Sequence, residues 1–250
     1  SAVLYLFSPD GHFVGRVSVT GEQIVRHAPV LLPVEALDRC HVSTWTNAGA
    51  GQLFHSPVQG SGIEERAVSL IEGEDTFHGT PDDLFFGHAR LAPVGAAGPE
   101  VITLARKNAR MRITVRGLDR RIPEDRYYLT VEIPNDGYDF VGNPIAGTAR
   151  VRRTGAFHDN GDFSTDEAFN LIHTDPAVSP AGGVTVNLYE KALGRSADRL
   201  IASVTDDDGR PISLPTGRTV NLLIDLNEGG GLSVYTEITP WDEIYQWDIW

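Results

Sequence analysis

The amino-acid sequence predicts an all-β protein built from antiparallel sheets. Apolar and polar residues alternate with a period of two in several short segments, as in half-buried strands. Turn-forming Gly, Pro, Asn and Asp residues separate these segments. The longest stretch without Gly or Pro, residues 100–116, takes on the strand pattern in its second half. No long helix is therefore expected.

The expected strands follow one another along the chain, each with one apolar face. The first begins at once, over residues 1–7. In residues 110–116 the inward positions are Met111, Ile113 and Val115. Further strands are predicted over residues 127–133 (with Tyr127, Leu129, Val131 and Ile133 facing inward), 184–189, 220–226 and 232–238.

Turns and short helices are predicted between the expected strands. Residues that tolerate positive φ predict turns at 9–11, 135–137, 160–162, 208–209 and 229–231. Two helical turns are predicted over residues 166–173, after Ser164 or Thr165 as an N-cap, and one turn over 34–39 after Pro33.

The length of 250 residues fits two β-sandwiches better than one. The turn-rich segment 143–147, followed by the basic run 150–153, predicts a boundary that divides the chain into residues 1–146 and 147–250. The segments 56–62 and 91–98 are rich in small residues and lack periodicity, so they are expected to be exposed loops.

Composition limits the classes of partner. With 21 Lys and Arg against 34 Asp and Glu, the net charge is −13, which argues against binding nucleic acid or anionic membrane surfaces. No apolar run is long enough to span a membrane, and residues 1–7 do not have the pattern of a signal peptide. Any secretion signal would have to lie upstream of residue 1.

The single cysteine, Cys40, excludes an internal disulfide and a cysteine-rich metal site. Cys40 and His41 are neighbours on a predicted strand, so their side chains point to opposite faces and do not form a nucleophile–base pair. We expect Cys40 to be a buried, inert thiol.

No catalytic, cofactor-binding or metal-binding residue is predicted. The sequence has no Gly-x-Ser-x-Gly, HExxH, Walker or dinucleotide-binding motif, and Gly49-Ala50-Gly51 lacks the third glycine and the helix of a phosphate loop. The acidic segments 206–209 and 159–167 lack the ligand order of a calcium loop and are expected to be solvated turns. The histidines, which do not have the spacing of zinc ligands, are His12, His27, His41, His55, His78, His88, His158 and His173.

Tryptophan is concentrated at the C-terminus. Of the four residues, Trp45, Trp241, Trp247 and Trp250, three lie in the last ten positions. Such a cluster can cover the edge of a core, bind a glycan or dock a partner. The acidic residues neither nominate nor exclude the carboxylate pair of a glycosidase. These alternatives stay open on the residues alone.

The order of motifs resembles FimB-like fimbrial anchor proteins, the fimbrillin-associated anchor subunits of Bacteroides-type (type V) pili. The N-terminal segments that carry the resemblance are residues 4–14 (LYLFSPDGHFV), 40–47 (CHVSTWTN), 82–88 (DDLFFGH), 107–115 (KNARMRITV) and 135–140 (NDGYDF). The C-terminal segments are 186–190 (VNLYE), 221–226 (NLLIDL) and 238–244 (ITPWDEI). No single segment is specific, but their order covers nearly the whole chain.

This resemblance implies two tandem transthyretin-like β-sandwiches and a non-catalytic role in cell adhesion. It implies a lipoprotein of the outer membrane that anchors or terminates a fimbrium and binds other pilus subunits, with strand addition as a suitable mode.

Family members carry a signal peptide, a lipid-modified cysteine and an extra first strand before the segment that begins here. Cys40 lies within a predicted strand and cannot be the lipidated residue. Either the sequence starts downstream of these family segments, or this member lacks the anchor. The N-terminal sandwich is therefore expected to lack an edge strand, which leaves a groove for a strand of a partner. The partner-binding residues stay unassigned. Besides the fimbrial anchor, two alternative functions are considered. The first alternative is a surface carbohydrate-binding module that uses the Trp-rich C-terminal segment, and the second is a glycosidase.

Overall fold

The computed structural model describes residues 1–32, 39–91, 100–174, 182–194, 197–227, 230–243, 245 and 247. Nearly all regular structure in these residues is β-strand, which confirms the predicted fold class. The helical elements are α1 (Gly21–Val25) and two 3-10 turns, η1 (Glu74–Thr76) and η2 (Glu124–Arg126). No helix among the described residues is long and apolar enough to cross a membrane.

The first sheet collects strands from the N-terminal part of the chain. Its order is β2–β1–β3–β6–β7, and every pairing is antiparallel. The strands are β1 (Ala2–Phe7), β2 (Phe13–Val19), β3 (Cys40–Thr46), β6 (Phe85–Leu91) and β7 (Ala105–Arg106). The strand predicted from the first residues onward is confirmed as β1.

The second sheet is organised around one long strand, β9 (Tyr127–Asp139). Its order is β15–β14–β9–β5–β4, and β10 also pairs with β9. The other strands are β4 (Gln52–Phe54), β5 (Arg66–Leu70), β10 (Pro144–Arg153), β14 (Thr185–Glu190) and β15 (Arg199–Val204). β14 pairs with residues 127–132 of β9 and β5 with residues 137–139, while β10 pairs along 129–138. β14 and β5 therefore share the edge of β9 that β10 leaves free.

The third sheet has the order β11–β12–β8–β18–β19, and β13 also pairs with β8. Its strands are β8 (Asn108–Arg116), β11 (Gly155–Phe157), β12 (Phe163–Thr165), β13 (Phe169–Ile172), β18 (Arg218–Leu226) and β19 (Leu232–Pro240). β8 and β18 are parallel, unlike the other paired strands of the described chain. A separate hairpin joins β16 (Asp206–Asp207) to β17 (Arg210–Pro211).

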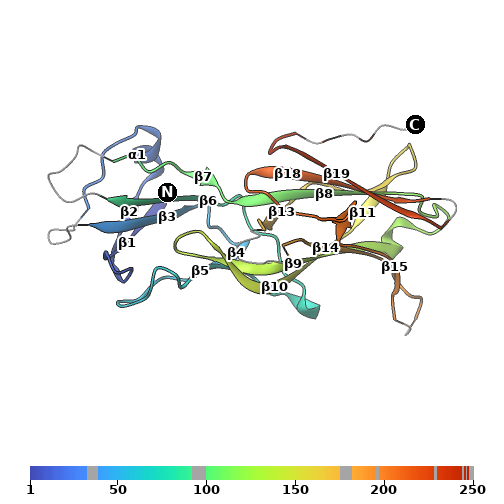
Figure 1. Cartoon of the computed structure of the whole chain (residues 1–250), viewed down its shortest axis with the longest axis horizontal. Helices are drawn as coiled ribbons and strands as arrows, with labels where there is room; N and C mark the ends of the chain where they lie inside the picture. The colour runs from blue at the N-terminus through green and yellow to red at the C-terminus, as the bar shows by residue number, and fades with distance from the viewer. Residues whose placement is uncertain are drawn as a thin grey trace.

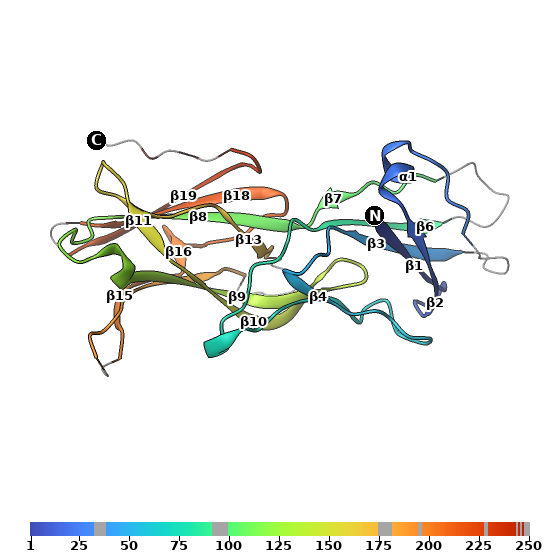
Figure 2. The ribbon, with the colours of Figure 1, turned by 180° about the vertical axis from the view of Figure 1, so that it is seen from behind.

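The three sheets form an elongated molecule (Figure 1). The first sheet lies at one end, the third lies towards the other, and the second sheet runs beneath both, as the view from behind also shows (Figures 1 and 2). One buried apolar cluster contains residues from all three sheets. The second sheet thus shares one core with the first sheet at one end of the molecule and with the third sheet towards the other.

The predicted inward faces are confirmed. Met111, Ile113 and Val115 of β8 are completely buried. The predicted inward residues of β9 are at most 1% exposed. The strands predicted over 184–189, 220–226 and 232–238 correspond to β14, β18 and β19. The alternation follows burial in β8, whereas residues 219–224 of β18 are buried on both faces and most of β19 is exposed or half-buried.

Two predicted local structures are wrong. Residues 169–172 form strand β13 instead of a helix, because Phe169 and Leu171 pair with β8 and enter the core. Residues 135–137 are no turn, because they lie inside β9. Gly137 instead allows β5 and β9 to lie close together, because a Cβ there would collide with the carbonyl oxygen of Val68 on β5.

The one described α-helix, α1, was not predicted. Its N-cap, Thr20, accepts a hydrogen bond from the backbone N–H of Gln23, and the Gln23 side chain accepts one from the backbone N–H of Thr20. This capping box was visible in the sequence as Thr-x-x-Gln. The helix predicted over 34–39 falls almost wholly outside the described residues, as does most of the loop predicted over 91–98.

The division into residues 1–146 and 147–250 stays a prediction. A boundary at this point falls inside β10. Strand pairing also crosses it, since β8 pairs with β18 and β9 pairs with β14. Two units divided at this point would therefore share hydrogen-bonded strands.

Candidate functional site

Unpaired strand edges are the main recognition features of this fold, because they offer free backbone donors and acceptors. The outermost strands are β2 and β7 in the first sheet, β15 and β4 in the second, and β11 and β19 in the third. β4 has only three residues, whereas β1 and β3 above it have six and seven. The short β4 leaves part of the first sheet uncovered.

A groove of about 750 Å³ opens where β4 fails to cover the first sheet. Its lining includes Val3, Tyr5, Trp45, Asn47, Phe54 and Asp82. The rings of Tyr5 and Phe54 stack with centroids 5.4 Å apart, which joins the two sheets at the floor of the groove. Arg16 and Ser18 of β2 share the face of Tyr5 and Val3, and both are exposed. The groove thus continues onto the edge strand β2. We call it the β4 groove.

A carboxylate and two glycines shape one wall of the β4 groove. Asp82 accepts hydrogen bonds from the backbone N–H of Gly51 and from the side chain of Gln52, each at 3.1 Å. A Cβ at Gly49 would lie 2.7 Å from the Asp82 carboxylate, and one at Gly51 would lie 2.9 Å from the Asp82 backbone. The Gly49-Ala50-Gly51 loop therefore packs against an acid. A negative charge there disfavours phosphate, in agreement with the sequence analysis.

A second groove, of about 580 Å³, lies beside β19. Leu232, Val234 and Tyr235 line it together with Asp206 and Asp207 of the β16–β17 hairpin. The Asp207 carboxylate accepts hydrogen bonds from the backbone N–H and the hydroxyl of Thr236. The hairpin thereby occupies part of the β19 edge, so this edge is less open than β4.

The tryptophans of the C-terminal segment have different surroundings. Trp241 is 8% exposed, and the guanidinium groups of Arg106 and Arg110 lie 4.8 and 5.2 Å from its ring. A ring so little exposed is not an open platform for a glycan. Trp247 meets Tyr245 edge-on at 4.9 Å and lies 6.5 Å from Tyr235. Trp250 is outside the described residues, and Trp45 is a core residue of β3.

The expectation of solvated turns holds for the acidic segment 206–209 but only in part for 159–167, where Asp162 is buried and residues 163–165 form the buried strand β12. Asp206 accepts a hydrogen bond from the backbone N–H of Gly209 across the β16–β17 turn. Asp162 forms an ion pair with Arg116 and accepts from the Asn160 side chain. No group of three or more metal-ligating side chains occurs within the described part of the chain.

Cys40 is 2% exposed and carries a free thiol. Burial raises the pKa of this thiol, and the charge of Glu100 adds to the effect. His41 shares the opposite face of β3 with Ser43, so the fold does not make a nucleophile–base pair of Cys40 and His41. The thiol is thus protonated and shielded at neutral pH.

Most histidines form hydrogen bonds with residues other than histidine. The partners are Gly60 for His12, Ser69 for His55, Arg150 for His78, Ser164 for His158 and Tyr138 for His173. His41 and His88 are the exception, because β3 and β6 bring their rings together. Their sequence separation of 47 residues gave no sign of this contact.

Comparison with known proteins agrees with the fold. The family described as "Fimbrillin-A associated anchor proteins Mfa1 and Mfa2" matches residues 1–247. The fimbrial anchor protein Mfa2 from Porphyromonas gingivalis superposes with a TM-score of 0.65 at 13% identity, over 96% of this chain and 88% of that chain. A candidate polysaccharide-binding protein from Bacteroides thetaiotaomicron gives 0.68 at 14% identity, over 96% and 89%.

A candidate adhesin from Bacteroides thetaiotaomicron gives a TM-score of 0.62 at 12% identity, over 96% of this chain and 88% of that chain. No curated protein sequence matches this chain. Identities this low show a shared fold alone, whereas the family match extends over almost every residue. The chain therefore belongs to the fimbrillin-associated anchor proteins.

Proposed function

We propose that this protein is a non-catalytic subunit at the bacterial cell surface that anchors or assembles a fimbrium by binding other pilus subunits. Membership of the anchor family supports this role. The observation that carries it further is the β4 groove, where an apolar floor lies beside a short edge strand. A sheet edge beside an apolar groove accepts an extended peptide segment by strand addition.

The occupant that we propose is an extended segment of another fimbrial subunit with alternating apolar side chains. Backbone groups of this segment would pair with the free edge of β4, and its apolar side chains would cover Val3, Tyr5 and Phe54. The lining of the groove also includes Asp82 and Asp83, of which Asp83 is already paired with Arg106. A lysine or arginine residue in the segment would match the carboxylate of Asp82.

Filling the β4 groove tests this proposal. Ala50 is exposed and lines the groove, so Ala50→Trp adds bulk there without replacing a core residue. We expect cross-linking in intact cells, followed by affinity purification, to recover at least about tenfold less of the other pilus subunits. Val25→Trp is the matched control, because Val25 is 79% exposed on α1. Unchanged recovery with Ala50→Trp, in a variant of normal melting temperature, would exclude the groove as the binding site.

We further propose that the full-length protein is a lipoprotein of the outer membrane, attached through a cysteine N-terminal to residue 1. The burial of Cys40 supports this, because a thiol inside β3 cannot carry a lipid in the folded protein. A fatty-acid probe should label the full-length protein in cells and label Cys40→Ser equally. Absence of label from the wild type, or its loss in Cys40→Ser, would contradict the assignment.

Carbohydrate binding is a second candidate function. Tyr235 and Tyr245 are 48% and 40% exposed beside Trp247, so an aromatic surface is accessible although Trp241 is buried. Aromatic faces of this kind bind the apolar faces of sugars. A glycan array should then show binding that Trp247→Ala removes and Trp45→Phe retains. No binding, or binding that Trp247→Ala leaves unchanged, would exclude carbohydrate binding at this aromatic surface.

A further inference from the structure

Two histidines meet on the core-facing side of the first sheet, near one end of the molecule. In the register of β3 and β6, His41 lies opposite Arg90 and His88 lies opposite Ser43, so the two histidines are diagonal neighbours. Their rings are nearly parallel, at 17°, with centroids 5.5 Å apart. Nδ1 of His41 is 3.3 Å from Nε2 of His88. The register of the two strands fixes where the two side chains leave the backbone.

The two facing ring nitrogens form a hydrogen bond, so one of them carries a proton, which an ion bound between the rings would displace. Burial lowers the pKa of His41, and the charge of Arg90 lowers it further. Burial and the charge of His41 lower the pKa of His88, against an opposing effect of Asp139. The His41 ring also donates a hydrogen bond to the backbone of Pro9. A ring that donates one N–H to a backbone carbonyl presents its second nitrogen as an acceptor, the usual arrangement of a metal-ligating histidine.

The nitrogen separation matches a tetrahedral ion. Two Zn–N bonds of about 2.0–2.1 Å at a tetrahedral angle place the two nitrogens about 3.3–3.4 Å apart. Cis ligands of a square-planar ion would be only about 2.8 Å apart. The observed 3.3 Å is the length of the hydrogen bond between the rings and also equals the separation that the tetrahedral case requires. His88 is exposed, so its ring can rotate until both lone pairs converge on one ion.

A buried hydroxyl without a partner lies next to this pair. Ser43 is completely buried, and its Oγ has no hydrogen-bond partner. It shares the strand face of His41, two residues away, and is paired directly with His88. Burying an unsatisfied hydroxyl is costly, so a polar group bound between the histidines would satisfy it. A water molecule on a metal ion is such a group.

Nearby charges act in both directions. Arg90 lies opposite His41 and disfavours a cation. Asp139 of β9 faces His88 and favours one. The Asp139 carboxylate accepts hydrogen bonds from the backbone N–H groups of Val141 and Asn143, each at 2.8 Å, so it supplies charge and not a ligand. The ion would therefore depend on the two imidazoles for its protein ligands.

We propose that His41 and His88 form a two-histidine site for Zn²⁺. The Oγ of Ser43 accepts a hydrogen bond from a water on the ion. The remaining coordination positions face solvent beside the exposed His88 and take water or a donor from a second chain. Nothing in this site depends on the β4 groove or on pilus binding, so the two proposals stand or fall separately.

Calorimetric titration of the tag-free protein with ZnCl₂ at pH 7.5 tests the site. We expect saturable binding of one ion per chain. His88→Gln should weaken it by at least about tenfold, because even outer-shell changes cost a zinc site that much. The control is His27→Asn, which removes an exposed imidazole where φ is 51° and Asn is tolerated. This variant should bind like the wild type.

Imidazole nitrogen NMR identifies the ligands without relying on variants. Zinc should shift Nδ1 of His41 and Nε2 of His88 and leave the other histidines unchanged. Equal zinc affinity of the wild type and His88→Gln, absence of saturable binding, or shifts confined to other histidines would each overturn the proposal.

Discussion

The indole of Trp241 lies 4.8 Å from the guanidinium of Arg106, and Arg106 in turn forms an ion pair with Asp83. Arg106 belongs to β7 of the first sheet, whereas Trp241 directly follows β19 of the third. The backbone carbonyl of Trp241 also accepts hydrogen bonds from Arg110 and Thr219. One aromatic side chain thus connects two sheets at opposite ends of the molecule.

Trp241→Ala should lower the free energy of unfolding by about 3 kcal/mol, because it removes a nearly buried ring and its contacts with two guanidinium groups. Chemical denaturation measures this loss. Trp247→Ala is the control and should cost about 1 kcal/mol or less, since the aromatic neighbours of Trp247, Tyr235 and Tyr245, are themselves exposed. Equal losses for the two variants would refute the bridging role of Trp241.

Gly137→Ala should destabilise the protein by about 2 kcal/mol or more. A Cβ at this position would collide with the carbonyl oxygen of Val68, so β5 and β9 would have to separate. Thermal unfolding followed by circular dichroism detects the change. Gly15→Ala in β2 is the control, because a Cβ there meets nothing within 4 Å. A normal melting temperature for Gly137→Ala would show that the strands separate at little cost.

The protein should lose stability between about pH 7 and pH 5 in the presence of EDTA. The unfolded chain protonates His41 and His88 near pH 6.5, whereas the folded chain does so only at lower pH because both pKa values are lowered. Unfolding therefore takes up protons, and acid favours it. Urea midpoints at both pH values measure the effect. His88→Gln should show a smaller loss than the wild type, and an equal loss would assign the effect to other groups.

Cys40 should not react with a thiol reagent such as DTNB in the folded protein. Its side chain is buried, and its pKa is raised. In guanidinium chloride the same reagent should titrate one thiol per chain, in line with the single cysteine. Rapid reaction under native conditions would show that the cluster of Leu6, Cys40 and Val42 opens readily.

Strands with one buried face could be predicted from the sequence, because alternation alone sets their pattern. β8 and β9 are examples, with inward residues that the structure confirms as buried. Local pattern could not tell that residues 169–172 are a strand, since their pairing with β8 depends on residues about 60 positions earlier. The turn expected at residues 135–137 was wrong for the same reason, because Gly137 is required by its close contact with β5 and not by its neighbours in the sequence.

The candidate site was less accessible to sequence analysis than the fold. A groove for an added strand was expected, yet its residues come from β1, β3, β4 and the loop that contains Asp82, which only strand pairing brings together. The contact of His41 with His88 likewise depends on the register of β3 against β6. Trp241 was recognised as part of an aromatic cluster, but its two arginine neighbours lie more than a hundred residues earlier.

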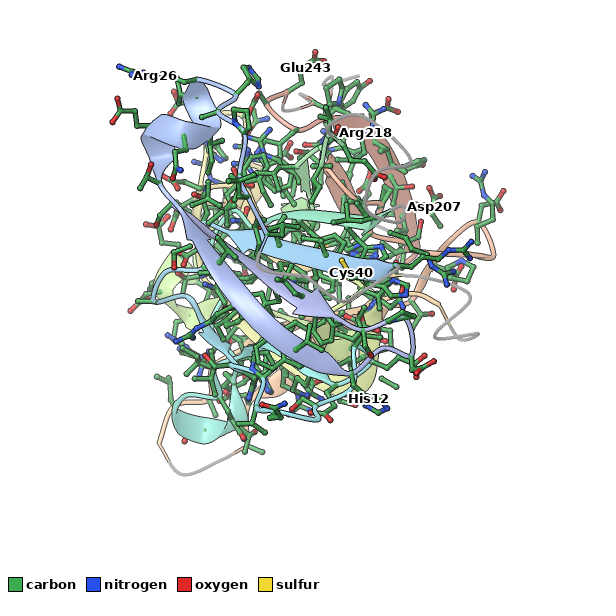
Figure 3. All side chains as sticks on the ribbon, turned by 90° about the vertical axis from the view of Figure 1, so that its left-hand side faces the viewer. His12, Arg26, Cys40, Asp207, Arg218 and Glu243 are labelled. Atoms are coloured by element: carbon green, nitrogen blue, oxygen red, sulfur yellow. The ribbon has the colours of Figure 1, made fainter. Side chains whose placement is uncertain are left out.

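The shared strand β9 has a mechanical consequence. Its two ends pair with β14 and with β5, and β10 runs beside it along most of its length, near the long axis of the molecule (Figure 1). Seen along that axis, the strands of the first sheet cross the near end with Cys40 inside and His12 at the rim (Figure 3). Sliding β9 along its own direction would have to shear its ladders with β10, β14 and β5, breaking several hydrogen bonds together. A force perpendicular to β9 would break them one at a time. The shared strand thus resists displacement along its own direction.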